Sequence, residues 1–275
     1  MAANALRNSS YFTDIEILEQ GLGILCKNNA VVRALVDLRH TEIISLLCKY
    51  ISQIELYNPA LGLVGTTGRQ ELIRRHILDS LAPLGLFCRL LESQNCFSEA
   101  QGNIGDVRIA DVGSGAGLPG IPLAIVMPQA YFTLIECMRR RAGFLRDALK
   151  ILALSNVTVI EDEAEKFAHN AAVNNSSDAA LFNLVTFRAF KPLEPKILKS
   201  LFRLCCTGGV LAAYKGRREK IEKEVSALEK YAGAAGKSRF LLSGCEIIPC
   251  PTPLLAEERH ILLIRGRANS GGMEQ

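Results

Sequence analysis

A glycine-rich stretch at residues 111–120, DVGSGAGLPG, constrains the fold of this chain more than any other segment. It follows a short apolar run, VRIADVG, and leads into LPGIPLAIVM, where proline is tolerated in a first helical turn. Glycines allow positive φ and let a ligand approach the backbone closely. In an open α/β sheet, ligands bind beyond the carboxyl ends of the strands. The stretch therefore predicts a ligand-binding turn between a strand and a helix.

Apolar runs alternate with amphipathic helical patterns from this turn onward, as in AYFTLIE, then MRRRAGFLRDALKILAL, then NVTVIED. Such alternation indicates βαβ units and a parallel sheet. The last two runs, SRFLLSGCEIIPC and RHILLIRG, are joined too closely for a crossover helix, so they should pair antiparallel. We expect an α/β fold with about seven strands, mostly parallel, and one antiparallel edge strand.

The chain before this region has a different pattern. Residues 11–92 show helical spacing of apolar side chains, and Asn58-Pro59 should end one helix, because the residue before proline is pushed out of the helical region. Residues 95–105 are polar and contain glycine, which is typical of a boundary. The sequence thus predicts a helical N-terminal extension over residues 1–105 and a Rossmann-like domain over residues 106–275.

The net charge of +4 over 275 residues is unevenly distributed. Residues 1–100 hold nine basic and ten acidic side chains, whereas residues 188–220 hold nine basic and two acidic ones, a local charge of +7. A basic rim near the strand ends would bind phosphates, and Lys215, Arg217 and Arg218 are the RNA-binding candidates. The row of Lys196, Lys199 and Arg203 is equally well explained as a solvated helix face.

The nine cysteines contain no C-x-x-C pair, and the four histidines are scattered, so we expect no metal site. Most of the cysteines lie in apolar segments, which favours reduced, buried thiols. The N-terminus lacks the apolar core of a secretory signal, and no aliphatic run reaches membrane-spanning length. We expect a cytoplasmic protein that does not enter a membrane.

Two cofactor classes fit the glycine turn. Gly115, Gly117 and Gly120 form G-x-G-x-x-G, which is compatible with a dinucleotide. S-adenosylmethionine is favoured because Asp111, directly before the glycines, would repel a pyrophosphate and could instead meet a cationic or hydroxyl group. Two prolines in the following helix opening also remove N–H donors that a pyrophosphate would use. Glu136, at the end of the second strand, would accept ribose hydroxyls.

Six collinear segments carry a resemblance to a known family: RRHILDSL at 74–81, DVGSGAGLPGIPLAI at 111–125, EAE at 163–165, FRAF at 187–190, GGVLAAYKG at 208–216 and ERHILLI at 258–264. Together they resemble the bacterial RsmG (GidB) family. The resemblance implies a Rossmann-like class I methyltransferase that uses S-adenosylmethionine to methylate guanine N7 in 16S ribosomal RNA. Its partner would be this RNA or the small ribosomal subunit.

The resemblance also implies cofactor-binding residues. Gly113 and Leu118 lie in the glycine turn, Ala164 and Glu165 follow the third strand, and Arg188 follows the fourth. With the residues chosen from the turn and strand pattern, the full cofactor-binding prediction is Gly113, Gly115, Leu118, Glu136, Ala164, Glu165 and Arg188. The chain departs from the family pattern at Glu163, where the family usually has arginine, at NPALGLVG near residue 58, and in a longer segment over residues 86–106.

Guanine N7 has a lone pair and no proton, so methylation there requires no general base and none is predicted. His76 and Asp79, three residues apart, are interpreted as a structural or RNA-facing feature rather than as an acid–base pair. Two further hypotheses remain open. One is a cofactor-linked RNA-binding or assembly factor without catalysis, and the other is a nicotinamide-dependent oxidoreductase.

Overall fold

A helical region precedes the sheet in the computed structural model, which describes residues 2–27, 29–66, 68–94, 97–98, 103–104, 107–173, 181–189, 193–234 and 242–266. Its elements are α1 (Ala2–Lys27), α2 (Ala30–Asp37), α3 (His40–Leu61), α4 (Arg69–Leu72), a π-helical segment (Ile73–Leu78), α5 (Asp79–Leu81), α6 (Leu84–Ser93), β1 (Phe97–Ser98) and β2 (Asn103–Ile104). The predicted helical N-terminal region is confirmed. From α4 to α5 the helical elements follow one another without a break.

Helix α3 does not end at Asn58-Pro59, so that expectation is wrong. The helix runs on to Leu61, with Pro59 in its last turn, where the missing N–H removes only one helical hydrogen bond. Gly62 then ends the helix in the left-handed region, with φ of 55° and its N–H donating to Asn58 O at 2.9 Å. Asn58 Oδ1 also accepts from Val64 N–H at 2.9 Å, which fixes the loop that follows.

The sheet begins with the apolar run that precedes the glycine turn. Its strands and helices are β3 (Arg108–Val112), α7 (Gly120–Val126), β4 (Tyr131–Ile135), α8 (Arg139–Leu152), β5 (Val157–Ile160), α9 (Ala164–Val173), β6 (Phe182–Arg188), α10 (Pro195–Phe202), β7 (Cys205–Lys215), α11 (Arg218–Ala234), β8 (Leu242–Pro249) and β9 (His260–Gly266). The strand order is β5-β4-β3-β6-β7-β9-β8. Neighbours from β5 to β7 pair parallel.

The antiparallel pairing lies at one edge of the sheet, where β9 pairs antiparallel with both β7 and β8. The predicted seven-stranded, mostly parallel α/β sheet with an antiparallel edge is therefore confirmed. One detail differs from the expectation: the reversed strand, β9, lies one place in from the edge. It is inserted between β7 and β8, so β8 forms the edge itself.

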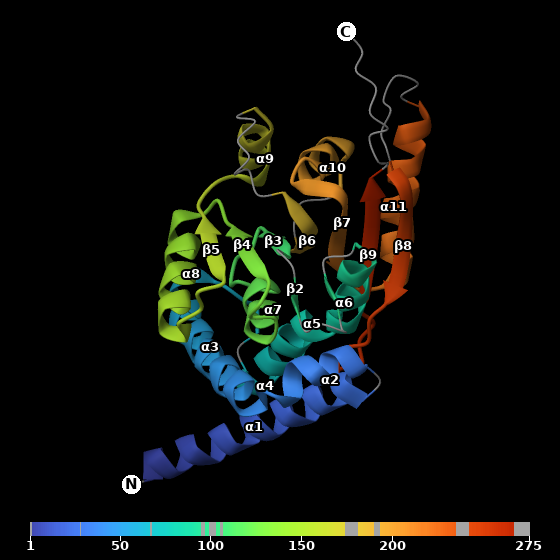
Figure 1. Cartoon of the computed structure of the whole chain (residues 1–275). Helices are drawn as coiled ribbons and strands as arrows, with labels where there is room; N and C mark the ends of the chain where they lie inside the picture. The colour runs from blue at the N-terminus through green and yellow to red at the C-terminus, as the bar shows by residue number, and fades with distance from the viewer. Residues whose placement is uncertain are drawn as a thin grey trace.

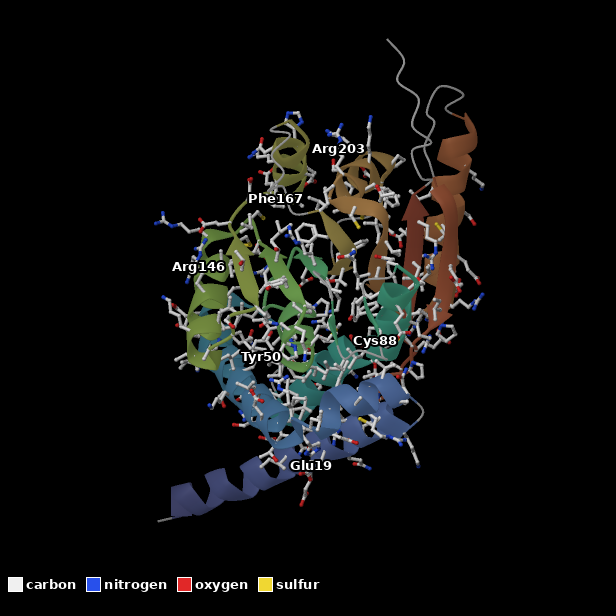
Figure 2. The ribbon with its side chains drawn as sticks, in the orientation of Figure 1. Glu19, Tyr50, Cys88, Arg146, Phe167 and Arg203 are labelled. Carbon is white, nitrogen blue, oxygen red and sulfur yellow. The ribbon has the colours of Figure 1, made fainter. Side chains whose placement is uncertain are left out.

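Helices cover both faces of the sheet (Figure 1). Helices α7 and α8 pack on one face together with α3, α5 and α6, and helices α9, α10 and α11 cover the other. The buried side chains form one hydrophobic cluster on each face. Cys88 of α6 belongs to the first cluster, and Phe167 of α9 packs against the second (Figure 2). Both faces bury apolar side chains, as expected for parallel strands.

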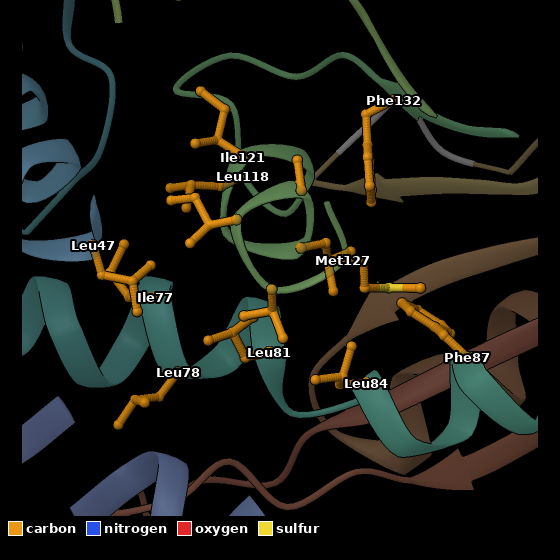
Figure 3. Close-up of a cluster of buried hydrophobic side chains, with 14 of the residues drawn as sticks. Leu47, Ile77, Leu78, Leu81, Leu84, Phe87, Leu118, Ile121, Met127 and Phe132 are labelled. Carbon is orange, nitrogen blue, oxygen red and sulfur yellow. The ribbon is translucent and has the colours of Figure 1, made fainter. Parts of the chain in front are cut away.

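The first cluster joins the N-terminal helices to the sheet. Ile77 and Leu81 come from the helical segment before α6, and they lie beside Leu118 and Ile121 of the glycine turn and α7 (Figure 3). All four are at most 4% exposed. One continuous apolar core therefore links the two parts of the chain, while a domain division at residues 105 and 106 stays a prediction.

Candidate functional site

The glycine turn joins β3 to α7 at the carboxyl edge of the sheet. Gly113 and Gly115 have φ of 69° and 56°, in the left-handed region that suits glycine. The N–H groups of Gly113 and Ser114 both donate to Ile135 O, at 2.9 and 3.2 Å. A Cβ on Gly115 would meet only Gly113 O, at 3.8 Å. The backbone of the turn is thus fixed, and open space lies in front of it.

Two buried side chains hold this turn in place through hydrogen bonds to its backbone. Glu136, 4% exposed at the end of β4, accepts from Gly115 N–H through Oε2 and from Met138 N–H through Oε1, both at 2.8 Å. Tyr50 of α3 is fully buried, and its hydroxyl donates to Ala116 O. The N-terminal helical region therefore contacts the turn directly.

Asp111 lies at the end of β3 and is 1% exposed. Its Oδ2 accepts from Gly120 N–H at 3.0 Å, at the start of α7, and its Oδ1 has no hydrogen-bond partner among the described residues. Burial raises the pKa of this carboxyl to about 7. Asp111 does not line the cavity in front of the turn, so the structure places it in support of α7 rather than against a ligand.

A cavity of about 580 Å³ opens in front of the turn. Gly113, Gly115 and Leu118 line it from the turn, Arg188 from the end of β6, and Lys215 from the end of β7. Other parts of the wall come from residues 63–65, from the helical segment that includes residues 75–83, from Arg141 of α8, and from residues 250 and 259–261 at the two ends of the β8–β9 connection. The structure thus brings four of the predicted cofactor-binding residues and one predicted RNA-binding residue to one cavity.

The other three predicted cofactor-binding residues do not line this cavity. Glu136 directly follows β4, and Ala164 and Glu165 begin α9, just after β5. Because β4 and β5 lie beside β3 in the sheet, all three residues follow the same strand edge as the turn. Their predicted contacts with a cofactor stay predictions.

Cations dominate the cavity wall. Its basic side chains are Arg75, Arg141, Arg188, Lys215 and Arg259, whereas Asp79 is the one carboxylate among the described residues that line it. Some of this charge is compensated just outside the wall, since Arg75 pairs with Glu71 and Glu257 and Lys215 pairs with Glu224. The lining keeps an excess of positive charge, which attracts an anionic ligand.

The basic residues at and after the end of β7 differ in whether they form ion pairs with described residues. Lys215 Nζ lies 2.7 Å from Glu224 Oε2, and Arg218 Nε lies 2.8 Å from Glu222 Oε1. Arg217 is exposed and forms no ion pair with a described residue. Neither Arg217 nor Arg218 lines the cavity, so they belong to its surroundings. Lys196 and Lys199 are exposed on α10, away from the cavity lining.

The sequence interpretation did not name Arg75 or Arg259 as site residues. Both lie within segments that carry the family resemblance, RRHILDSL and ERHILLI, and that placement was the available signal. His76 also lines the cavity, and neither of its ring nitrogens has a hydrogen-bond partner among the described residues. Burial, reinforced by the charges of Arg188, Arg259 and Arg75, lowers the pKa of His76 to about 4. The imidazole is therefore neutral at pH 7.

The described residues contain neither a metal-binding cluster nor a membrane-spanning helix. No group of three or more histidine, cysteine, aspartate or glutamate side chains there could hold a metal ion. No helix in the described part of the chain is long and apolar enough to span a membrane.

Comparison with known proteins identifies the family. Residues 43–243 match the family model GidB, described as rRNA small subunit methyltransferase G. A protein of that name from Treponema denticola is 32% identical over 263 residues, which cover 87% of this chain and 95% of the relative. Its namesake from Treponema pallidum (strain Nichols) is 33% identical over 80% of this chain and 84% of the relative.

Solved structures were compared as well. An rRNA methylase from Streptococcus thermophilus aligns with 67% of this chain and 96% of its own, with 15% identity and a TM-score of 0.41. The family match covers most of the chain, including the glycine turn and the segments RRHILDSL and FRAF. The chain therefore belongs to the rRNA small subunit methyltransferase G family.

Proposed function

We propose that this protein transfers a methyl group from S-adenosylmethionine to N7 of a guanine in 16S ribosomal RNA. Membership of the rRNA small subunit methyltransferase G family supports RNA methylation as the reaction class. The observation that carries the proposal is the single cavity in which a fixed glycine turn meets a cationic wall. One side suits a small cofactor, and the other suits an RNA phosphate.

The residues present fit S-adenosylmethionine. A volume of about 580 Å³ lies within the usual range of small-molecule sites. The space in front of Gly115, which a side chain there would fill, lets a ligand approach the backbone. Gly113, Gly115, Leu118 and Arg188 would hold the cofactor in the cavity. Glu136, Ala164 and Glu165 would hold its nucleoside along the adjoining strand edge.

When bound, S-adenosylmethionine supplies an electrophilic methyl group on a sulfonium. Guanine N7 carries a lone pair, so the protein need not remove a proton and must mainly align the two reactants. The glycine turn fixes one reactant through its rigid backbone. Arg259 lines the same cavity as the cofactor-binding Arg188 and provides positive charge for the RNA. Leu63 and Val64 cover part of the cavity and exclude water there.

The substrate is 16S RNA, either free or in the small ribosomal subunit, and the exposed Arg217 beside the cavity would contact its phosphates. We place the reaction in the cytoplasm. The eight cysteines that the structure describes are not joined in disulfides, which is typical of a reducing compartment.

The test is methyl incorporation from labelled S-adenosylmethionine into 16S RNA that lacks the modification, supplied both as free RNA and as small subunits. We expect label in 7-methylguanine at one position. Normal cofactor binding without any labelled 7-methylguanine would favour an assembly factor. Calorimetric binding of NAD but not of S-adenosylmethionine would instead favour an oxidoreductase.

A further inference from the structure

The carboxylate of Asp79 connects three parts of the molecule beside the cavity. Asp79 begins α5 and is 6% exposed. Its Oδ1 accepts from Arg259 Nε at 3.0 Å and from Thr252 Oγ1 at 2.9 Å, and its Oδ2 accepts from Arg188 Nη1 at 3.2 Å. Arg188 ends β6, whereas Thr252 and Arg259 belong to the connection between β8 and β9. A residue of the N-terminal region thus binds two arginines of the sheet region.

Both arginines keep donors for a ligand. A guanidinium carries five N–H donors. Arg188 uses Nη1 for Asp79, and Arg259 uses Nε for Asp79 and Nη1 for Glu258 O. Arg188 Nε and Nη2 and Arg259 Nη2 have no recorded partner among the described residues, and both side chains line the cavity. Asp79 therefore fixes each guanidinium at one end and leaves its other donors for the reactants.

The charges of this cluster do not balance. One carboxylate faces two guanidinium groups, so the cluster keeps about one positive charge at the cavity wall. A free arginine loses rotamer entropy when a ligand orders it, and a partner that already fixes it reduces this cost. A buried ion pair adds little stability compared with packed apolar side chains. Orientation of the arginines is thus the better explanation of the cluster.

Resting on the methyl transfer proposed above, we infer that Asp79 is a positioning residue for that reaction. Its carboxylate holds Arg188 toward the cofactor and Arg259 toward the RNA, so that sulfonium, methyl and guanine N7 are brought into line. The oxygens of Asp79 are bonded to Arg188, Arg259 and Thr252, so its effect on the reactants passes through the two arginines. Its loss should therefore change the rate of a folded enzyme.

The first test replaces Asp79 with asparagine, which keeps the shape and removes the charge. We expect kcat/KM for 16S RNA to fall about 100-fold, the loss typical of a small misplacement of reacting groups. Asp79→Glu keeps the charge and should recover about 10-fold of this loss. Thr252→Val is the matched control, because it removes a hydrogen bond to the same carboxylate but frees neither arginine. It should stay within about 3-fold of wild type.

A double-variant cycle tests whether Asp79 acts through Arg259. If it does, Asp79→Asn with Arg259→Gln loses clearly less than the product of the two single losses. If the fold-loss of kcat/KM in the double variant equals the product of the two single fold-losses, the inference is overturned. An Asp79→Asn protein with wild-type thermal unfolding and a kcat/KM within about 3-fold of wild type would also overturn it.

Asp79→Asn leaves two guanidinium groups without their carboxylate and can fail to fold, so a second variant leaves Asp79 intact. Arg259→Lys keeps the charge but loses the planar fork, and kcat/KM should fall about 10-fold. Arg74→Lys is its control, because Arg74 bonds Gln70 and does not line the cavity. Unchanged kinetics in Arg259→Lys would overturn the inference. If the wild-type protein does not methylate 16S RNA, both the proposed function and this inference are wrong. If the wild-type protein is active and the variants have the same kcat/KM, only the inference is wrong.

Discussion

The cavity has two walls of different composition. The backbone wall is the glycine turn with Gly113 and Gly115, and the cationic wall holds Arg75, Arg141, Arg188, Lys215 and Arg259. On the backbone wall the ligand would meet backbone groups, which hydrogen bonds to Glu136 and Tyr50 hold in place. On the cationic wall it would meet long side chains that come from separate elements and are oriented by Asp79. Ligand binding at the backbone wall should therefore be sensitive to substitution of the glycines themselves. Ligand binding at the cationic wall should depend on the residues that pair with its arginines.

The largest effect is expected on the backbone wall. Gly113→Val places a β-branched residue at φ of 69° and a side chain in the cavity lining, so the Kd for S-adenosylmethionine should rise at least about 100-fold. Gly143→Val is the control, because a Cβ on Gly143 of α8 meets open space. Isothermal calorimetry measures both. A folded Gly113→Val protein with the wild-type Kd would contradict the expectation that the backbone wall is sensitive to substitution of its glycines.

Asp111, which supports α7 after the glycine turn, and His76, which lines the cavity, should respond oppositely to pH. The pKa of Asp111, raised to about 7, adds stability below pH 4 that is lost as pH rises to 7. The pKa of His76, lowered to about 4, adds stability above pH 6.5 that is lost as pH falls to 4. The effect is on the order of 4 kcal/mol for Asp111 and on the order of 3 kcal/mol for His76.

Denaturant unfolding across pH 4 to 7 measures this contrast. Relative to wild type, the unfolding free energy of Asp111→Asn should increase more with rising pH, because the opposing contribution is gone. That of His76→Gln should increase less. Two variants whose pH profiles run parallel to wild type would show that neither group has the assigned pKa.

Support behind the backbone wall should have a smaller effect. Tyr50→Phe removes the donor to the buried Ala116 O, so the unfolding free energy should fall by about 1–2 kcal/mol, and cofactor affinity should weaken several-fold. Tyr57→Phe is the control, since the Tyr57 hydroxyl donates to the partly exposed Asp147 at 3.2 Å. Equal losses in the two variants would remove the special role of Tyr50.

The smallest effect is expected at the rim of the cationic wall. Arg217→Gln should reduce the salt dependence of RNA binding by about 0.7–0.9 in slope, the contribution of one phosphate contact, and leave cofactor affinity unchanged. Arg203→Gln removes the same charge before β7, at the opposite end of that strand, and should leave the slope unchanged. Filter binding at several salt concentrations distinguishes the two variants.

The sequence predicted the strand, turn and helix of the backbone wall because their signals are local, while ligand binding there stays a prediction. Strand, glycines and prolines are consecutive, so residues 111–120 alone indicate a ligand turn. The cationic wall depends on residues up to 180 positions apart, as in the bond between Asp79 and Arg259, and no spacing rule connects them. The family resemblance brought attention to their segments but not to their contacts.

Two other features could not be predicted for the same reason. Arg140 and Arg141 belong to the basic run MRRRAGFLR at the start of α8, and the sequence alone indicates no partner for them. In the structure they donate to Ala60 O and Gly62 O at the end of α3, each at 3.3 Å. The insertion of β9 was also missed, because the hydrophobic pattern of a strand does not specify which strands it pairs with.

The place of β9 affects how the nascent chain can mature. Strands β3 to β7 and the edge strand β8 are all synthesised before residues 260–266, yet β9 must enter between β7 and β8. Until then β7 has an open edge, which can pair with another chain. Arg259, the residue directly before β9, also reaches Asp79 only at that stage. The cationic wall is therefore completed after the glycine turn, and a chain stalled before residue 259 would carry the turn but lack the finished cavity.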